Sequence, residues 1–211
     1  MISSTTFIAL AMQCAATVHP DTAMDVARVE SGFNPYAIAE IIPKKQRLEG
    51  GRSVITHLPK NKSDAISIVN DIEKKKRRYS VGLMQITSTN FAKFNVDAEK
   101  LFNPCINLTV FEKIITDCYT RGKTLKNGLS CYYTGNFNTG KKKESEFNQT
   151  SYIERIGYPD SPGKTYIVPS TKEDKGEVKK EEIDVKEKTS KEPTTIYPSR
   201  LIRGDLQLSK N

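Results

Sequence analysis

The sequence predicts a mainly α-helical protein: a single helical domain with at most a short β element, followed by a disordered C-terminal tail. The length of 211 residues allows one ordinary domain with an extension. Several segments before residue 158 carry apolar residues at helical spacing, between residues that typically start or end helices. From residue 159 onward, Lys and Glu alternate with scattered Pro, Ser and Thr. Because such a composition buries too little apolar area to offset chain entropy, we expect a domain over residues 1–158 and a polar, disordered tail over residues 159–211.

Two helices are expected near the N-terminus. Residues 5–16 fit an amphipathic helix, although Phe7–Met12 also has the look of a short signal-peptide core, without a preceding Lys or Arg. A second short helix has Asp21 as its cap and ends at Gly32. Residues 36–62 mix Pro, Gly and basic residues with small apolar clusters, which favours a loop with a short strand.

The remaining helices are predicted from their caps and apolar spacing. The longest carries an apolar stripe at i, i+3, i+7 and i+10, formed by Leu108, Phe111, Ile115 and Cys118. An apolar loop, Gly82–Ile86, precedes a short helix capped by Ser88 or Thr89. The other expected helices run from Ser63 or Asp64 to the basic run Lys74–Arg78, from Asn103 to Gly122, around Leu129–Tyr133, and over Ser151–Ile156.

The charge is basic, and the excess lies in the expected domain. The formal net charge is +8, and the last 42 residues hold ten basic and nine acidic side chains, so the domain carries nearly all of it. Such a charge suits an anionic partner. The basic residues are dispersed and form no helix-turn-helix, zinc or RNP-like pattern, so we expect no nucleic-acid partner. No apolar run approaches 18 residues, so no transmembrane segment is predicted.

The four cysteines leave the redox compartment open. They form no C-x-x-C pair and are accompanied by only two histidines, so we expect no metal site and no cofactor. Two disulfides are possible, in three connectivities, and would indicate an oxidising compartment. Buried free thiols in the cytosol are the alternative.

Glu30 is the side chain whose position in the sequence suggests a catalytic role. On the second helix, Ala23, Val26, Ala27 and Glu30 fall at i, i+3, i+4 and i+7, so the carboxyl group continues an apolar stripe. Burial raises the pKa of such a carboxyl group, and the negative end of the helix dipole raises that pKa further. Both effects favour a protonated general acid. The alternative is a carboxylate that reaches solvent from a frayed helix end.

Four short motifs, met in order, resemble those of lysozyme-like lytic transglycosylases. The similarity covers roughly residues 5–157 and is nearest to the small transglycosylases of type IV secretion and conjugation systems. Each motif alone is weak, but four in order at fitting intervals are specific. The motifs are Glu30-Ser31-Gly32-Phe33-Asn34-Pro35, Gly82-Leu83-Met84-Gln85-Ile86, Cys131-Tyr132-Tyr133-Thr134-Gly135 and Tyr152-Ile153; the subgroup features are Met12-Gln13-Cys14-Ala15, Val18-His19-Pro20, Asn103-Pro104-Cys105 and Ser130-Cys131-Tyr132.

This resemblance implies a mainly α (α+β) lysozyme-like fold and a peptidoglycan lytic transglycosylase. Glu30 matches the catalytic acid/base that cleaves the MurNAc–GlcNAc β-1,4 bond. The N-acetyl group of MurNAc serves as the nucleophile, so one carboxylate suffices and the product ends in 1,6-anhydroMurNAc. The resemblance further implies periplasmic localisation, glycan strands as substrate, and a local opening of the wall for a secretion or conjugation apparatus, whose components are further possible partners.

Five residues match groove or substrate-binding positions of the family. Tyr132 matches the tyrosine whose hydroxyl bonds to the catalytic glutamate, and Tyr152 matches an aromatic of the groove wall. Tyr133 departs from the family pattern, because it stands where the motif has Asn, and its bulk would reshape the site near the acetamido group. The full set is Met84, Gln85, Tyr132, Tyr133 and Tyr152.

Two alternatives and a disulfide pairing complete the expectations. Glu40 stands where relatives have a small or apolar residue; folded into the groove, it would act as a base for water and make the enzyme a hydrolytic muramidase. A catalytically inactive wall-binding or assembly factor is the other alternative. A periplasmic site favours disulfides, and the short connection between two helices favours Cys118–Cys131, which leaves Cys14–Cys105 as the second pair.

Overall fold

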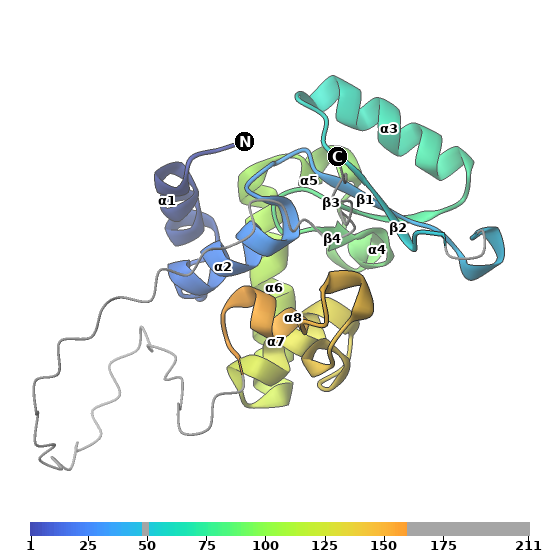
Figure 1. Cartoon of the computed structure of the whole chain (residues 1–211). Helices are drawn as coiled ribbons and strands as arrows, with labels where there is room; N and C mark the ends of the chain where they lie inside the picture. The colour runs from blue at the N-terminus through green and yellow to red at the C-terminus, as the bar shows by residue number, and fades with distance from the viewer. Residues whose placement is uncertain (48–50, 160–211) are drawn as a thin grey trace, which may run out of the picture.

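A computed structural model of the chain describes residues 1–47 and 51–159 (Figure 1). The mainly helical fold predicted from the sequence is confirmed. Apart from Pro159, the predicted tail over residues 159–211 lies outside the described residues. Within them, the helices are α1 (Ser4–Cys14), α2 (Pro20–Ser31), α3 (Lys62–Lys74), α4 (Phe91–Phe94), α5 (Ala98–Leu101), α6 (Pro104–Gly122), α7 (Leu125–Thr134) and α8 (Tyr152–Ile156).

The first two helices pack against each other, and α2 carries the stripe that buries Glu30. Helix α1 is capped by Ser3, and its Phe7 lies fully buried in the core. Helix α2 is capped by His19, whose side chain accepts a hydrogen bond from the Asp21 amide, so the cap lies two residues before the predicted one. Gly32, in the left-handed conformation, ends α2 as the sequence predicts.

Four short antiparallel strands form a sheet in the order β2-β1-β3-β4. Their bounds are Ile38–Ile41 (β1), Val54–His57 (β2), Arg78–Val81 (β3) and Ile86–Thr87 (β4). The sequence predicts one short strand here, because segments of two to four residues are too short to display a clear alternation. The end of the basic run, Arg78, belongs to β3 and not to the preceding helix.

Helix α3 covers one face of the sheet. Residues paired across antiparallel strands point to the same face, and Glu40 of β1 pairs with Tyr79 of β3. The Tyr79 hydroxyl donates to the Glu73 carboxylate of α3 at 2.5 Å. Glu40 and Tyr79 therefore lie on the face that α3 covers, and α8 lies on the other side of the sheet (Figure 1).

Helices α6 and α7 form the centre of the helical part. The Asn103 side chain caps α6 by accepting from the amides of Cys105 and Ile106. The predicted stripe of α6 is buried, and α7 packs along it. The short helix expected after Ser88 begins as a 3₁₀ turn and continues as α4.

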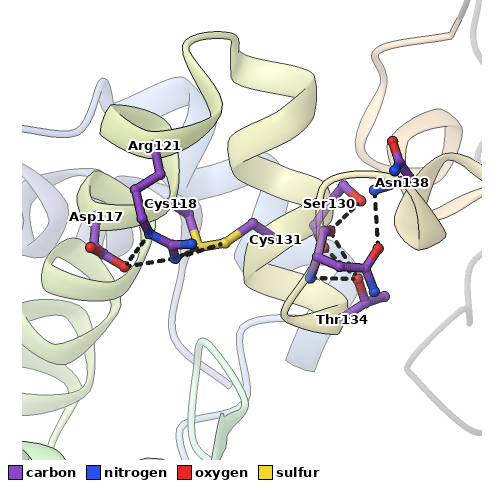
Figure 2. Close-up of a disulfide and its surroundings, with 8 residues drawn as sticks. Asp117, Cys118, Arg121, Ser130, Cys131, Thr134 and Asn138 are labelled. Atoms are coloured by element: carbon purple, nitrogen blue, oxygen red, sulfur yellow. Dashed lines mark hydrogen bonds and ion pairs between the residues drawn. A yellow bond between two sulfur atoms is a disulfide. The ribbon is translucent and has the colours of Figure 1, made fainter.

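Two disulfides cross-link these helices, in the pairing that the sequence favours. Cys118–Cys131 joins α6 to α7, and Cys14–Cys105 joins the end of α1 to the start of α6. Figure 2 shows the first bridge, with Arg121 extended between it and Asp117, whose carboxylate lies 2.8 Å from the guanidinium. The cross-links hold α1, α6 and α7 together beside α2.

Candidate active site

Glu30 lies in the last turn of α2 with only 1% of its surface exposed. Its Oε1 accepts a hydrogen bond of 2.6 Å from the hydroxyl of Tyr152. The predicted burial of this carboxyl group is therefore confirmed. Burial disfavours the ionised form of a carboxyl group, whereas a donated hydrogen bond favours it, so the two influences oppose each other at Glu30.

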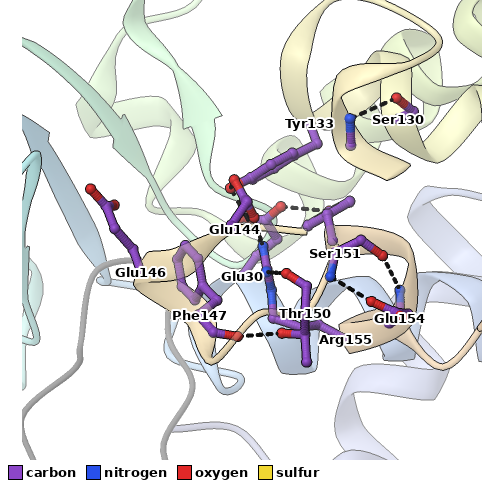
Figure 3. A network of polar contacts seen from close by, with 12 residues as sticks. Glu30, Ser130, Tyr133, Glu144, Glu146, Phe147, Thr150, Ser151, Glu154 and Arg155 are labelled. Carbon is purple, nitrogen blue, oxygen red and sulfur yellow. Dashed lines mark hydrogen bonds and ion pairs between the residues drawn. The ribbon is translucent and has the colours of Figure 1, made fainter. Parts of the chain in front are cut away.

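Tyr152 is held at the first position of α8. Ser151 caps this helix with a reciprocal arrangement: its hydroxyl accepts from the Glu154 amide at 3.2 Å, and its own amide donates to the Glu154 carboxylate at 2.6 Å. Figure 3 shows this cap beside Glu30. The Tyr152 ring is 1% exposed, so both its position and its surroundings are fixed by the fold.

Tyr132, the tyrosine that the third motif singles out, contacts the turn between β3 and β4. Its hydroxyl donates to the main-chain carbonyl of Met84, and its ring packs edge-on against Phe111 of α6. A phenol has one proton to donate, and this one is used on the Met84 carbonyl. The Tyr152 hydroxyl donates to Glu30. The pairing of Tyr132 with Glu30, which the motif implies, stays a prediction.

Met84 and Gln85 are buried in a tight turn between β3 and β4. Met84 is fully buried, and Gln85 adopts a left-handed backbone with its amide donating to the carbonyls of Ala37 and Gly82. Both side chains are buried, so the structure does not present them on an open surface. Their assignment to substrate binding stays a prediction.

Asn107 anchors the same turn, and sequence reasoning missed it. Its fully buried side chain accepts from the Met84 amide at 2.9 Å and donates to the carbonyls of Val81 and Leu101. The signal was available, since Asn107 is an amide directly beside the apolar stripe of a long helix. A buried amide that meets three main-chain groups fixes their positions.

The family model of the transglycosylase SLT domain matches residues 7–154. This chain belongs to that family. It is 36% identical over 159 residues to the type IV secretion system protein virB1 of Brucella abortus biovar 1 (strain 9-941), an alignment covering 71% of this chain and 62% of the relative. It is 30% identical over 146 residues to protein virB1 of Agrobacterium fabrum (strain C58), covering 66% of this chain and 56% of the relative.

The chain thus spans a little under two thirds of the length of these curated relatives. No solved structure matches it significantly. Glu30, Tyr132 and Tyr152 all fall within the matched SLT domain, which gives the geometry of these residues a family context.

Tyr133, the departure from the motif of this SLT domain, lies against Tyr152. The two rings are parallel to within 6° with centroids 4.1 Å apart. The Tyr133 hydroxyl donates to Oε1 of Glu144 at 2.9 Å, and Oε2 of Glu144 lies 2.6 Å from the Arg155 guanidinium. Glu144 and Arg155 come from a loop and from α8, and no sequence pattern singled them out.

Glu40, the candidate second carboxylate, is engaged elsewhere in the SLT domain. It is 1% exposed and accepts from Arg77 at 2.6 Å and from His57 at 3.0 Å. Burial alone would raise the pKa of Glu40, but the hydrogen bonds from Arg77 and His57, with the charge of Lys75, hold that pKa below its usual value. Since it lies on the α3 face of the sheet, Glu40 does not face the side where α8 holds Tyr152.

Residues 1–47 and 51–159 contain no group of three His, Cys, Asp or Glu side chains arranged to hold a metal ion. In the same part of the chain, no helix combines the length and apolar character needed to cross a bilayer.

Proposed function

We propose that this chain is a peptidoglycan lytic transglycosylase that cleaves the β-1,4 bond between MurNAc and GlcNAc and leaves 1,6-anhydroMurNAc. The observation that carries the proposal is the buried Glu30 carboxyl group, held by the Tyr152 hydroxyl inside an SLT domain. A buried carboxyl group that accepts a hydrogen bond is suited to work first as an acid and then as a base.

The proposed reaction returns the proton that it uses. Glu30 gives its proton to the glycosidic oxygen as the bond to the anomeric carbon breaks, and the carbonyl oxygen of the N-acetyl group bonds to that carbon. Glu30, now ionised, takes the proton of the 6-hydroxyl. The 6-oxygen then displaces the acetamido oxygen from the anomeric carbon, which closes the anhydro ring without water. The Tyr152 hydroxyl stabilises Glu30 in its ionised interval.

One carboxylate is enough for this chemistry, and two other acids near the sheet and α8 have partners. Glu40 is bound by Arg77 and His57 on the far face of the sheet. Glu144 is bound by Arg155 and Tyr133. The geometry therefore favours the substrate-assisted route over a hydrolytic muramidase that uses Glu40 as a second carboxylate.

We further propose that the protein works in the periplasm, opening the wall locally for a type IV secretion or conjugation apparatus. Two disulfides suit an oxidising compartment. The relatives named type IV secretion system protein virB1 and protein virB1 supply the context of the apparatus. The net charge of +8 suits a wall that carries acidic peptides and polymers.

The decisive experiment is mass spectrometry of muropeptides released from purified sacculi under oxidising conditions. Wild type should release products one water lighter than hydrolytic muropeptides, and Glu30→Gln should release none. Glu99→Gln is the matched control, because it neutralises an exposed carboxylate in α5 that pairs with Lys62. Reducing-end products would indicate a hydrolase. No release by wild type would favour a wall-binding or assembly factor, and full activity of Glu30→Gln would remove Glu30 from its role.

A further inference from the structure

Five side chains form a continuous row that ends at Glu30. Arg155 pairs with Glu144, Glu144 accepts from the Tyr133 hydroxyl, and the Tyr133 ring stacks on Tyr152, which donates to Glu30. Figure 3 shows Tyr133 reaching toward Glu144 in the region that also holds Glu30 and Arg155. The members come from α2, α7, α8 and the loop between α7 and α8.

We propose that Tyr133 is a positioning residue: its ring fixes the Tyr152 ring so that the Tyr152 hydroxyl stays directed at Glu30. This proposal rests on the proposed function of Glu30 as acid/base. It gives a role to the position where this chain departs from the motif of its family, since an Asn there would offer no ring for Tyr152 to stack on.

The stack constrains the one motion that would break the hydrogen bond. A tyrosine hydroxyl moves away from its acceptor when the ring swings about the bonds that join it to the main chain. A parallel ring at 4.1 Å, covering the face of Tyr152, opposes that swing. Tyr152 itself is anchored at the first position of α8 by the Ser151 cap, so main chain and ring face are both fixed.

Tyr133 is in turn held at its far end. Its hydroxyl donates to Glu144, and a second contact from Arg155 reaches the same hydroxyl oxygen at 3.4 Å. A ring secured by α7 at one end and by a hydrogen bond at the other has little freedom to rotate. This is why a tyrosine, and not simply any aromatic side chain, suits the position.

The Glu144–Arg155 pair is a rigid support for this bond. The Arg155 side chain is 5% exposed, donates to the Thr150 carbonyl at 3.0 Å, and lies 3.9 Å from the centroid of the Phe147 ring. Figure 3 shows Phe147 and Thr150 beside it. The two charges neutralise each other, so the support adds no net charge near Glu30.

The test compares Tyr133→Ala, Tyr133→Asn and Tyr133→Phe with Tyr152→Phe and with the double variant Tyr133→Ala/Tyr152→Phe. Loss of a donor to a carboxylate raises the pKa of that carboxyl group, so the alkaline limb of the pH–rate profile moves upward. Tyr152→Phe should lower kcat by roughly tenfold or more and move this limb up by about one pH unit.

Tyr133→Ala and Tyr133→Asn should reproduce both effects, with kcat about tenfold lower. Tyr133→Phe keeps the stack and loses only the bond to Glu144, so its kcat should fall by about two- to fivefold. Because Tyr133 acts through Tyr152, the double variant should have a kcat within about threefold of Tyr152→Phe alone. KM should change little in all of them.

Three outcomes would overturn the proposal. The alkaline limb of the pH–rate profile could stay in place in Tyr133→Ala, or the double variant could lose kcat by the product of the two single losses. The third is a Tyr133→Ala variant in which only KM changes. A thermal melt of each variant separates simple unfolding from these effects. Titration of the Glu30 carboxyl carbon by NMR reports the same pKa shift without turnover. It therefore tests the positioning role even if wild type releases no anhydro products, in which case the proposed function alone fails.

Discussion

Tyr152 and Glu30 lie 122 positions apart in the chain, and the phenol and carboxylate oxygens lie 2.6 Å apart in the structure. The contact joins the last turn of α2 to the first residue of α8. It exists only when both ends of the SLT domain are folded against each other. Completion of the site is therefore coupled to docking of α8, whose cap and buried ring we expect to fold as one unit.

The roles of the two candidate tyrosines are separable by single substitutions. Tyr132→Phe removes the bond to the Met84 carbonyl and should lower the free energy of unfolding by about 1 kcal/mol. It should leave the alkaline limb of the pH–rate profile in place, because the Tyr152 hydroxyl still donates to Glu30. Denaturant melts and pH profiles of Tyr132→Phe and Tyr152→Phe check this. An upward shift of the limb in Tyr132→Phe would support the assignment made from the motif.

Two features require a glycine at position 82: its left-handed backbone conformation and the close approach of the Asn107 side chain. The φ of Gly82 is +81°, and a Cβ built there would lie 2.1 Å from the Asn107 side-chain nitrogen. Gly82→Ala should therefore lower the free energy of unfolding by roughly 3 kcal/mol or more, through strain and overpacking together.

Gly135 is the matched control for this substitution. Its φ is +80°, and nothing lies within 4 Å of a Cβ built there. Gly135→Ala should cost only the backbone strain, about 1–2 kcal/mol. Urea unfolding of both variants measures the difference. Equal losses would mean that Asn107 moves aside freely and does not fix the turn.

The helical part of this fold can be predicted from the sequence because long helices show a clear periodic spacing of apolar residues. The stripe from Ala23 to Glu30 predicts both the burial of the carboxyl group and the face of α2 that meets the core. The stripe of α6 and the short α6–α7 connection similarly lead to Cys118–Cys131. These are local properties, so one sequence suffices to find them.

The parts that were missed depend on contacts between distant segments. Strands of two to four residues show no decisive alternation, so the sheet was reduced to one strand. Tyr152 lies far from Glu30 in the sequence, and only the packing of α8 against α2 brings its hydroxyl to Glu30. Glu144 reaches Arg155 from a loop without regular spacing, and none of the four family motifs includes it.

The two disulfides should contribute unequally to stability. Cys14–Cys105 closes a loop with a sequence separation of 91, and Cys118–Cys131 one of 13. Each disulfide stabilises the folded state by lowering the entropy of the unfolded chain. The longer loop should contribute about 4–5 kcal/mol to the free energy of unfolding, and the shorter loop about 3 kcal/mol. Paired Cys→Ser variants, compared by urea unfolding, should rank in this order. The reverse order would show that local packing of α6 on α7 dominates over loop length.

Glu40 should make stability depend on pH in the acid range. Its folded-state pKa is held below the ordinary value of 4.5, so the unfolded chain binds the proton more tightly. The stabilisation is therefore complete above about pH 4.5 and is lost as the pH falls through the lowered folded-state pKa. Glu40→Gln leaves the half-buried Arg77 with a weaker partner and should lower the free energy of unfolding by roughly 3 kcal/mol at neutral pH.

Urea unfolding of wild type and Glu40→Gln between neutral and acidic pH checks this expectation, and the difference between the two proteins should shrink below about pH 4.5. Asp117→Asn is a suitable control, because its pKa is also lowered by a partner, Arg121, but the pair is half exposed on α6. Glu40→Gln should still release anhydro muropeptides, because the side chain at position 40 lies on the α3 face of the sheet and takes no part in the proposed reaction. A variant that folds stably at neutral pH but releases no product would return Glu40 to the chemistry.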